Sequence, residues 1–262
     1  MVRYNSQKHI YNYIDKKARD TFPRSLLLLG ESGCGKHTLC DYIAEKLNLQ
    51  LVNISEDLNF DFIMHLYEKP EPYLYIIEAS KISVKEQNII LKFIEEPMKN
   101  AFIVLLAETS NQLLPTILNR CQQLSFNPYT TEELKELTHD ELILKIARTP
   151  GQVNSLLSNN LQDIVTLVDK IINKIGSANL PNVLTIPDKL AFKQEKDKFD
   201  IECFSRTLNY MLLEKIKQDN NPKYLEMYKL VGEWIRKRKA PTIVQNFLFE
   251  SYLVKMHMLM KG

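Results

Sequence analysis

A glycine-rich loop near the N-terminus constrains this chain more than any other feature of its sequence. Residues 26–38 read LLLLGESGCGKHT, in which Gly30 is followed by four residues and then Gly35-Lys36. The apolar run before the loop predicts a buried strand, and the residues after it have helical spacing. Such a loop turns backbone N–H groups towards an anion, which also faces the helix N-terminus. The sequence predicts a phosphate-binding loop of Walker A type, assigned to Gly30, Gly33, Gly35, Lys36, His37 and Thr38.

The residue after the lysine departs from the usual form of such a loop. A Ser or Thr hydroxyl normally holds Mg²⁺ at this position, whereas here it is His37, and Thr38 follows one residue late. One helical residue turns through about 100°, so Thr38 does not replace the missing ligand without rearrangement. We expect phosphate binding to persist while the placement of Mg²⁺, and with it hydrolysis, is weakened. The alternative is a glycine turn that binds nothing.

An acidic residue follows the apolar stretch YLYII at residues 73–77. Nucleoside triphosphatases of this type need an acid at the end of a neighbouring strand, where it holds Mg²⁺ and polarises water. Glu78 occupies such a position, but Ala79 follows it, so the usual acidic pair is reduced to one acid. Glu78 either serves the nucleotide site or ends a buried strand at the solvent boundary.

Strand-like and helix-like segments alternate through the first half of the chain. Strands are predicted at 25–29, 51–54, 73–77, 102–107 and 122–126, and helices at 5–17, 36–47 and 85–95. This alternation implies a parallel sheet covered by helices on both faces. From residue 130 onward the spacing is helical, with a break at 149–151 and a proline-containing linker at 179–187. The apolar faces at 204–212 and 247–252 are expected to pack against other subunits.

Composition limits the class of protein. Hydrophobic residues make up 45% and charged residues 25%, a balance typical of soluble globular proteins and not of disordered chains. No apolar run reaches the length that a bilayer demands, and the N-terminus has no signal-peptide pattern, so we expect no membrane association. The four cysteines form no CxxC pair and the five histidines lack metal-ligand spacing, which indicates a cytoplasmic protein without a metal site. The net charge of +2 restricts any nucleic-acid binding to partners or a local patch such as 236–239.

Further motifs follow the acidic strand. Residues 78–97 read EASKISVKEQNIILKFIEEP, and residues 102–122 read FIVLLAETSNQLLPTILNRCQ. Together with the phosphate loop, they resemble the clamp-loader branch of the AAA+ ATPases, and within it the delta-prime family of bacterial DNA polymerase III. The Leu-Glu-Glu-Pro signature of that family appears as Ile94-Glu95-Glu96-Pro97, and its Ser-Arg-Cys motif as Asn119-Arg120-Cys121. The resemblance covers residues 1–180; beyond them it rests on helical character and length.

Four features favour the delta-prime family over its hydrolysing relatives. The loop has the form Gly-Lys-X-Thr-Leu, with His37 at X, and the acidic strand ends in the single acid Glu78. The zinc-binding cysteines of the gamma/tau subunits are absent, and Gln152 stands where a sensor-2 arginine would touch phosphate. The resemblance therefore implies that ATP is bound, with or without hydrolysis, and that ATPase activity of the chain itself is weak or absent.

The resemblance also implies roles for two residues outside the loop. Arg120 would act as an arginine finger in the ATP site of a neighbouring subunit, since a guanidinium is always charged and offers a rigid fork of donors. Thr109 would be the sensor-1 residue, or else a simple strand-end threonine. The implied partners are the delta and gamma/tau subunits in a hetero-oligomer, with the sliding clamp and primed DNA reached through the complex. The chain has no recognisable polymerase site.

The predicted organisation has three parts. These are an α/β AAA+ domain at 1–128, a small helical lid at 129–178 and an all-helical collar for oligomerisation at 180–262. Two alternatives remain open at this point. One is a self-sufficient AAA+ ATPase that uses Lys36, Thr38 and Glu78, and the other is a DNA-binding AAA+ factor of initiation or repair.

Overall fold

The computed structural model describes residues 3–56, 58–59, 72–96, 101–186, 190–191, 199–237 and 245–261. The chain forms two compact units. The first unit comprises residues 1–133 together with 149–151, and the second comprises residues 134–148 and 152–262. Among the described residues, no helix combines the length and the apolar character that crossing a bilayer requires.

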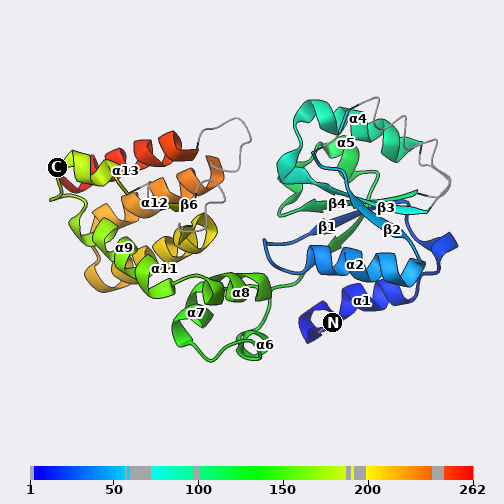
Figure 1. The fold of residues 1–262 in the computed structure, drawn as a ribbon, viewed down its shortest axis with the longest axis horizontal. Coiled ribbons are helices and arrows are strands. Elements are labelled where there is room, and N and C mark those ends of the chain that lie inside the picture. The colour runs from blue at the N-terminus through cyan, green and yellow to red at the C-terminus, as the bar shows by residue number, and fades with distance from the viewer. Residues whose placement is uncertain are drawn as a thin grey trace. The chain divides into compact units, whose positions relative to one another are not determined.

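The first unit is built on a parallel five-stranded sheet with the order β2-β3-β4-β1-β5 (Figure 1). Its strands are β1 (Ser25–Leu29), β2 (Gln50–Asn53), β3 (Tyr73–Glu78), β4 (Ala101–Ala107) and β5 (Gln122–Ser125). Leu29 lies opposite Ala107, and Glu78 lies opposite Leu106. The carboxyl ends of β1, β3 and β4 therefore meet at one edge of the sheet, the edge at which open α/β sheets bind ligands. The predicted parallel sheet is confirmed.

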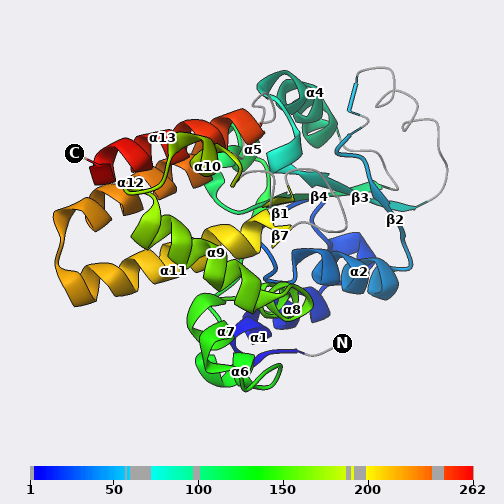
Figure 2. The same ribbon diagram turned by 60° about the vertical axis from the view of Figure 1, so that its left-hand side comes forward.

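Helices cover both faces of this sheet (Figures 1 and 2). They are α1 (Lys8–Asp15), α2 (Lys36–Leu47), α4 (Val84–Glu95) and α5 (Pro115–Leu118), with short 3-10 turns at Asn5–Gln7, Arg19–Thr21, Ala79–Lys81 and Ser110–Gln112. Successive side chains of a strand point to opposite faces. Leu26 and Leu28 accordingly pack with α1 and α2, while Leu27 belongs to the core beneath α4 and α5. Both central strands are thus buried between two apolar cores.

Helix α4 is fixed at its start and along one face. Ser83 N donates to the Glu86 carboxylate at 2.6 Å, and Glu86 N donates to the Ser83 hydroxyl at 3.4 Å, which together form a capping box. Phe93 and Ile94 are buried in the sheet core. The helix ends at Glu95, as predicted, and Pro97 lies outside the described residues.

The second unit is mainly helical, as predicted. Its helices are α7 (Glu141–Ile146), α8 (Pro150–Ser158), α9 (Leu161–Lys174), α10 (Leu180–Leu184), α11 (Ile201–Asp219), α12 (Pro222–Lys237) and α13 (Gln245–Lys261), while α6 (Thr131–Lys135) and the start of α8 cross the boundary between the units. Phe204, Trp234 and Phe249 pack ring against ring with centroids 4.6–6.2 Å apart. This aromatic cluster joins α11, α12 and α13 into one core.

Three details of the second unit differ from the sequence analysis. Residues 180–184 form a helix inside the segment interpreted as a linker, because Pro181 lies in the first turn, where a missing N–H costs no hydrogen bond. Two strands of two residues each, β6 (Leu190–Ala191) and β7 (Phe199–Asp200), form a parallel pair within the helical region.

The third difference concerns the faces expected to meet other subunits. Phe204, Leu208 and Tyr252 are at most 1% exposed, so they form the core of the second unit. Phe247, by contrast, is 69% exposed. The predicted division into three parts at 128 and 178 stays a prediction, because the two compact units are compatible with a further boundary inside the second unit and also with none.

Candidate functional site

The glycine-rich loop joins β1 to α2 in the expected conformation. Gly33 and Gly35 have φ angles of +77° and +97°, in the left-handed region that favours glycine. Gly30 N donates to Ala107 O at 3.1 Å, which ties the start of the loop to the end of β4. Helix α2 then begins at Lys36. The loop therefore lies at the carboxyl edge of the sheet, with the N-terminus of a helix directly after it.

The lysine of the loop folds back over the loop itself. Lys36 Nζ donates to Gly30 O at 2.5 Å and to Glu31 O at 3.0 Å. Carbonyl oxygens thus hold the ammonium group of Lys36 at the loop. Phosphate oxygens, which are also hydrogen-bond acceptors, could take their place. Cys34 is buried beside this ammonium group, and burial raises the pKa of the Cys34 thiol, which is typical of a packing residue.

A second segment binds the outer side of the loop. We call residues 149–151 the strap, because Thr149 Oγ1 donates to Ser32 O and Gly151 N donates to Gly33 O, both at 2.9 Å. The Tyr129 hydroxyl adds a hydrogen bond to Cys34 O at 2.7 Å. In a trans peptide the carbonyl and the following N–H point in opposite directions. These bonds therefore turn the N–H groups of the loop away from the strap.

The strap approaches the loop too closely for any side chain at its last residue. A Cβ atom added to Gly151 would lie 2.5 Å from the Cα atom of Gly33. The sequence indicated a break at Thr149-Pro150-Gly151, in a segment that resembles the sensor-2 region, but gave no sign that this segment or Tyr129 binds the loop. Gln152, the next residue, is buried and accepts a hydrogen bond from Arg148 N at 2.7 Å.

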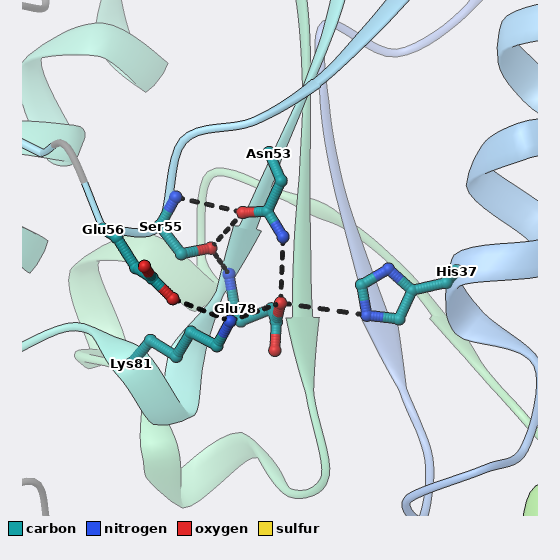
Figure 3. Close-up of polar contacts among 6 residues, drawn as sticks. All are labelled: His37, Asn53, Ser55, Glu56, Glu78 and Lys81. Carbon is teal, nitrogen blue, oxygen red and sulfur yellow. Dashed lines mark hydrogen bonds and ion pairs between the residues drawn. The ribbon is translucent and has the colours of Figure 1, made fainter. Parts of the chain in front are cut away.

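Glu78 lies at the end of β3 within a small polar cluster (Figure 3). Asn53 Nδ2 donates to its carboxylate at 2.9 Å, and Lys81 Nζ forms an ion pair with it at 3.2 Å. Glu78 N donates to the Ser55 hydroxyl at 2.8 Å, and that hydroxyl donates to Asn53 Oδ1 at 2.6 Å. Glu78, the acid predicted for the nucleotide site, therefore lies at the carboxyl edge of the sheet as expected, but its charge is already paired within the chain.

The electrostatics of Glu78 follow from these contacts. Burial raises the pKa of the Glu78 carboxyl, but the Asn53 and Lys81 hydrogen bonds and the nearby positive charge outweigh burial, so the net shift is downward. Lys81 also forms an ion pair with Glu56 at 3.2 Å, and its pKa is raised despite desolvation. The Glu78 carboxylate thus shares the Lys81 ammonium group with the Glu56 carboxylate.

The residue after Lys36 offers no hydroxyl ligand for a magnesium ion at this edge. His37 stands where the hydroxyl ligand belongs; its side chain is 58% exposed and its Nε2 lies 3.9 Å from Glu78 Oε1. Thr38 is exposed, one helical position further on. Among the residues that the structure describes, no group of three or more His, Cys, Asp or Glu could hold a metal. Glu78 and His37 thus lie together, but as parts of a hydrogen-bonded cluster.

Thr109 follows β4 at the same edge of the sheet. Its backbone N–H donates to Gln112 Oε1 at 3.3 Å, and that oxygen also accepts from Glu108 N at 2.6 Å. Within the described part of the chain, Thr109 makes no hydrogen bond to Glu78 or Lys36. Its sensor-1 role stays a prediction.

Arg120 lies apart from the phosphate loop, after α5. Its Nη2 forms an ion pair with Glu95 Oε1 at 2.8 Å, and its Nη1 donates to Thr116 O at 2.9 Å. The side chain is 42% exposed. No contact in the described part of the chain joins it to Lys36 or Glu78, so Arg120 has no part in the loop site of its own subunit.

With this geometry established, comparisons with known proteins become informative. Residues 52–130 match the family model described as "DNA polymerase III, delta subunit". The delta-prime subunit of Bacillus subtilis is 34% identical over 96 residues, which span 36% of this chain and 28% of that protein. The delta-prime subunit of Haemophilus influenzae is 33% identical over 66 residues, which span 25% and 20%. Over these segments the chain is similar to delta-prime subunits.

The sequence is more weakly similar to a DNA polymerase III gamma subunit, and the fold is similar to that of two solved structures. The DNA polymerase III gamma subunit of Buchnera aphidicola is 27% identical over 118 residues, 43% of this chain and 32% of that protein. Two structures from Thermotoga maritima share the fold. A single-residue variant of RuvB is 17% identical, with a TM-score of 0.53 over 97% of this chain and 88% of that one. A DNA polymerase III gamma subunit-related protein is 16% identical, with a TM-score of 0.50 over 98% of this chain and 100% of that one. The predicted fold, a parallel sheet covered by helices and followed by a helical region, is thereby confirmed. The chain spans less than a third of the length of the curated delta-prime subunits that it matches.

Proposed function

We propose that the chain is a delta-prime-like clamp-loader subunit of a bacterial DNA polymerase III, acting in the cytoplasm. It would assemble with delta and gamma/tau subunits and support the ATP-driven loading of a sliding clamp onto primed DNA. The match of residues 52–130 to the delta-subunit family model carries this proposal, since it spans Glu78, the α4–α5 region and Arg120.

Arg120 is the residue through which the chain would act on its partners. The proposed role is an arginine finger that stabilises charge developing on the phosphates in the ATP site of a neighbouring subunit. Two observations support it: the guanidinium is partly exposed, and it lies apart from the loop of its own subunit. A residue that serves its own ATP site would be expected beside Lys36.

The loop of the chain itself is proposed to bind ATP phosphates without efficient hydrolysis. The left-handed glycines, the helix N-terminus and Lys36 are chemistry for holding phosphate. Beside it, His37 takes the place of the hydroxyl that would hold Mg²⁺, and Glu78 is paired with Lys81, so neither side chain favours the placement of Mg²⁺. The same observations weigh against the self-sufficient ATPase, which needs Glu78 to be available.

The test is assembly followed by activity. The full chain is mixed with candidate delta, gamma/tau and clamp proteins, and the expected result is a stable complex that hydrolyses ATP faster with primed DNA and clamp. The chain alone should hydrolyse ATP weakly or not at all. Robust hydrolysis by the chain alone that Lys36→Ala abolishes would establish the self-sufficient ATPase instead. Tight binding of primed DNA by the chain alone, with no complex formed, would favour the DNA-binding factor.

A further inference from the structure

We propose that Glu95 is a positioning residue for Arg120, which sets the orientation of the guanidinium before it meets a neighbouring subunit. The inference rests on the proposed function of Arg120 and adds a residue to which the resemblance assigned no role. It starts from the 2.8 Å ion pair between Glu95 Oε1 and Arg120 Nη2. Thr116 O, which accepts from Nη1 at 2.9 Å, is the second anchor of the same group.

Both anchors are fixed to the core of the first unit. Glu95 is the last residue of α4, directly after the buried residues Phe93 and Ile94. Thr116, the second anchor, precedes Ile117 in α5. Ile117 is fully buried, and its carbonyl oxygen accepts a hydrogen bond from Arg120 N at 3.0 Å. The ion pair therefore joins two elements that pack on the same face of the sheet.

Two anchors on different nitrogens determine the plane of a guanidinium group. The group has five N–H donors in a rigid fork; here Nη1 donates to Thr116 O and Nη2 lies in the ion pair with Glu95. The remaining donors have no partner within the described residues, and the side chain is 42% exposed. Arg120 is thus ordered by its own subunit while part of its fork is left for another acceptor.

Ordering of this kind matters for catalysis more than for folding. A long side chain that is free in solution loses conformational entropy when it is fixed against a reacting group, and earlier ordering removes that cost from the reaction. An ion pair as exposed as this one contributes little to the stability of the fold. Removing Glu95 should therefore slow the reaction in the neighbour without destabilising the subunit.

The ion pair between Glu95 and Arg120 could instead hold Arg120 back from the neighbouring subunit. The direction in which the ATPase rate changes when Glu95 is removed distinguishes this role from orientation. If Glu95 only withheld Arg120 from the neighbour, removing the carboxylate would raise the rate of ATP hydrolysis. If Glu95 orients Arg120, removing it lowers that rate. The exposed, two-anchor geometry favours orientation, because part of the fork is already available while the ion pair is intact.

The experiment measures DNA- and clamp-stimulated ATP hydrolysis of the reconstituted complex. For Glu95→Ala we expect kcat to fall three- to tenfold, with KM for ATP and the melting temperature of the subunit nearly unchanged. Glu95→Asp, which keeps the charge, should restore part of the loss. In the background of Arg120→Ala, Glu95→Ala should cause no further loss, because the two residues act as one group.

A matched control separates this role from a general effect of losing a surface ion pair. Asp15→Asn removes the pair with Arg3, which is 2.9 Å long and similarly exposed at 44% and 38%, and should leave the rate unchanged. An unchanged or higher rate in Glu95→Ala, or an equal further loss in the Arg120→Ala background, would overturn the positioning role. If Arg120→Ala itself leaves the rate unchanged, the arginine finger of the proposed function fails instead.

Discussion

Lys36 and Arg120 are both cations of the first unit, but their surroundings differ. The ammonium of Lys36 is held by two carbonyl oxygens of its own loop. The guanidinium of Arg120 is held by one carbonyl and one carboxylate at the surface, apart from that loop. We therefore expect substitutions of Lys36 to affect phosphate binding by the chain itself, and substitutions of Arg120 to affect ATP hydrolysis in its neighbour.

For Arg120, the expected loss is in the complex. Arg120→Ala should lower the DNA- and clamp-stimulated ATPase at the affected site by at least about tenfold, which corresponds to about 1.4 kcal/mol. Arg120→Lys should recover little, since lysine lacks the planar fork. Nucleotide affinity of the isolated chain, measured by calorimetry, should stay the same. A mutant chain that loses its own nucleotide while the complex keeps its rate would contradict the assignment.

Lys81 contributes to the low pKa of Glu78. Lys81→Met removes the ion pair, while burial and the Asn53 hydrogen bond remain, so the pKa of the Glu78 carboxyl should rise above its value in the unmodified chain. The measurement is a ¹³C titration of the side-chain carboxyl. Lys229→Met, which removes only a surface pair with Glu226 on α12, should leave the Glu78 titration unchanged.

The same substitution changes how stability depends on pH. Because the folded pKa of Glu78 is lowered from its ordinary 4.5, its contribution is complete above that pH and is lost as the pH falls through the folded value. In Lys81→Met this acid-side loss should shrink. Urea unfolding at pH 7 and pH 3 should therefore show a smaller difference in the free energy of unfolding for the variant, and an equal difference would contradict the pairing.

Among the structural elements, the strap has the sharpest steric requirement. Gly151→Ala would place a methyl group 2.5 Å from the backbone of Gly33, where no flexible side chain can yield. We expect a loss of about 1–3 kcal/mol in the free energy of unfolding, as for other overpacked sites. Faster hydrogen exchange of the residue 151 amide should accompany it, because this amide donates to Gly33 O.

A glycine in α12 provides the control. A Cβ atom at Gly232 meets nothing within 4 Å, and the residue lies inside the helix. Gly232→Ala should therefore raise the free energy of unfolding, by about 0.5–1 kcal/mol. If both alanine variants behaved alike, close contact between the strap and the loop would not be the reason for glycine at 151.

Which elements the sequence could predict depends on how local their signals are. The strands were predictable because β1 and β4 are apolar runs buried on both faces, and α4 because its capping box and apolar spacing lie within one segment. The strap was not, since Thr149 and Ser32 are 117 residues apart and share no local pattern. The pairing of Glu78 with Lys81 was within reach, because the two lie three residues apart at a strand end.

For the molecule as a whole, assembly is predicted to depend on the second unit, and the core of that unit limits how this can be tested. Helix α9, whose Ile164, Val168 and Ile171 are fully buried, contacts α11. A truncation at residue 180 would remove α11 and expose that face. Loss of assembly by a truncated chain would therefore not distinguish a missing interface from a damaged fold, and point substitutions of exposed residues are the better test.

Phe247 and Met258 are the residues to change. They are 69% and 65% exposed and lie 11 residues apart on α13, which places them within about 20° of each other around the helix. Large apolar side chains on one helix face are typical of surfaces that pack against another subunit. Replacing both with serine should weaken co-purification with the other clamp-loader subunits at least tenfold while the melting temperature stays within a few degrees, because neither side chain belongs to the core.

Leu157→Ser, at a residue of α8 that is 50% exposed, should leave co-purification intact. Unimpaired assembly of the double variant would show that this face of α13 is not where the subunits meet, and equal loss in Leu157→Ser would show that the effect is not specific to α13.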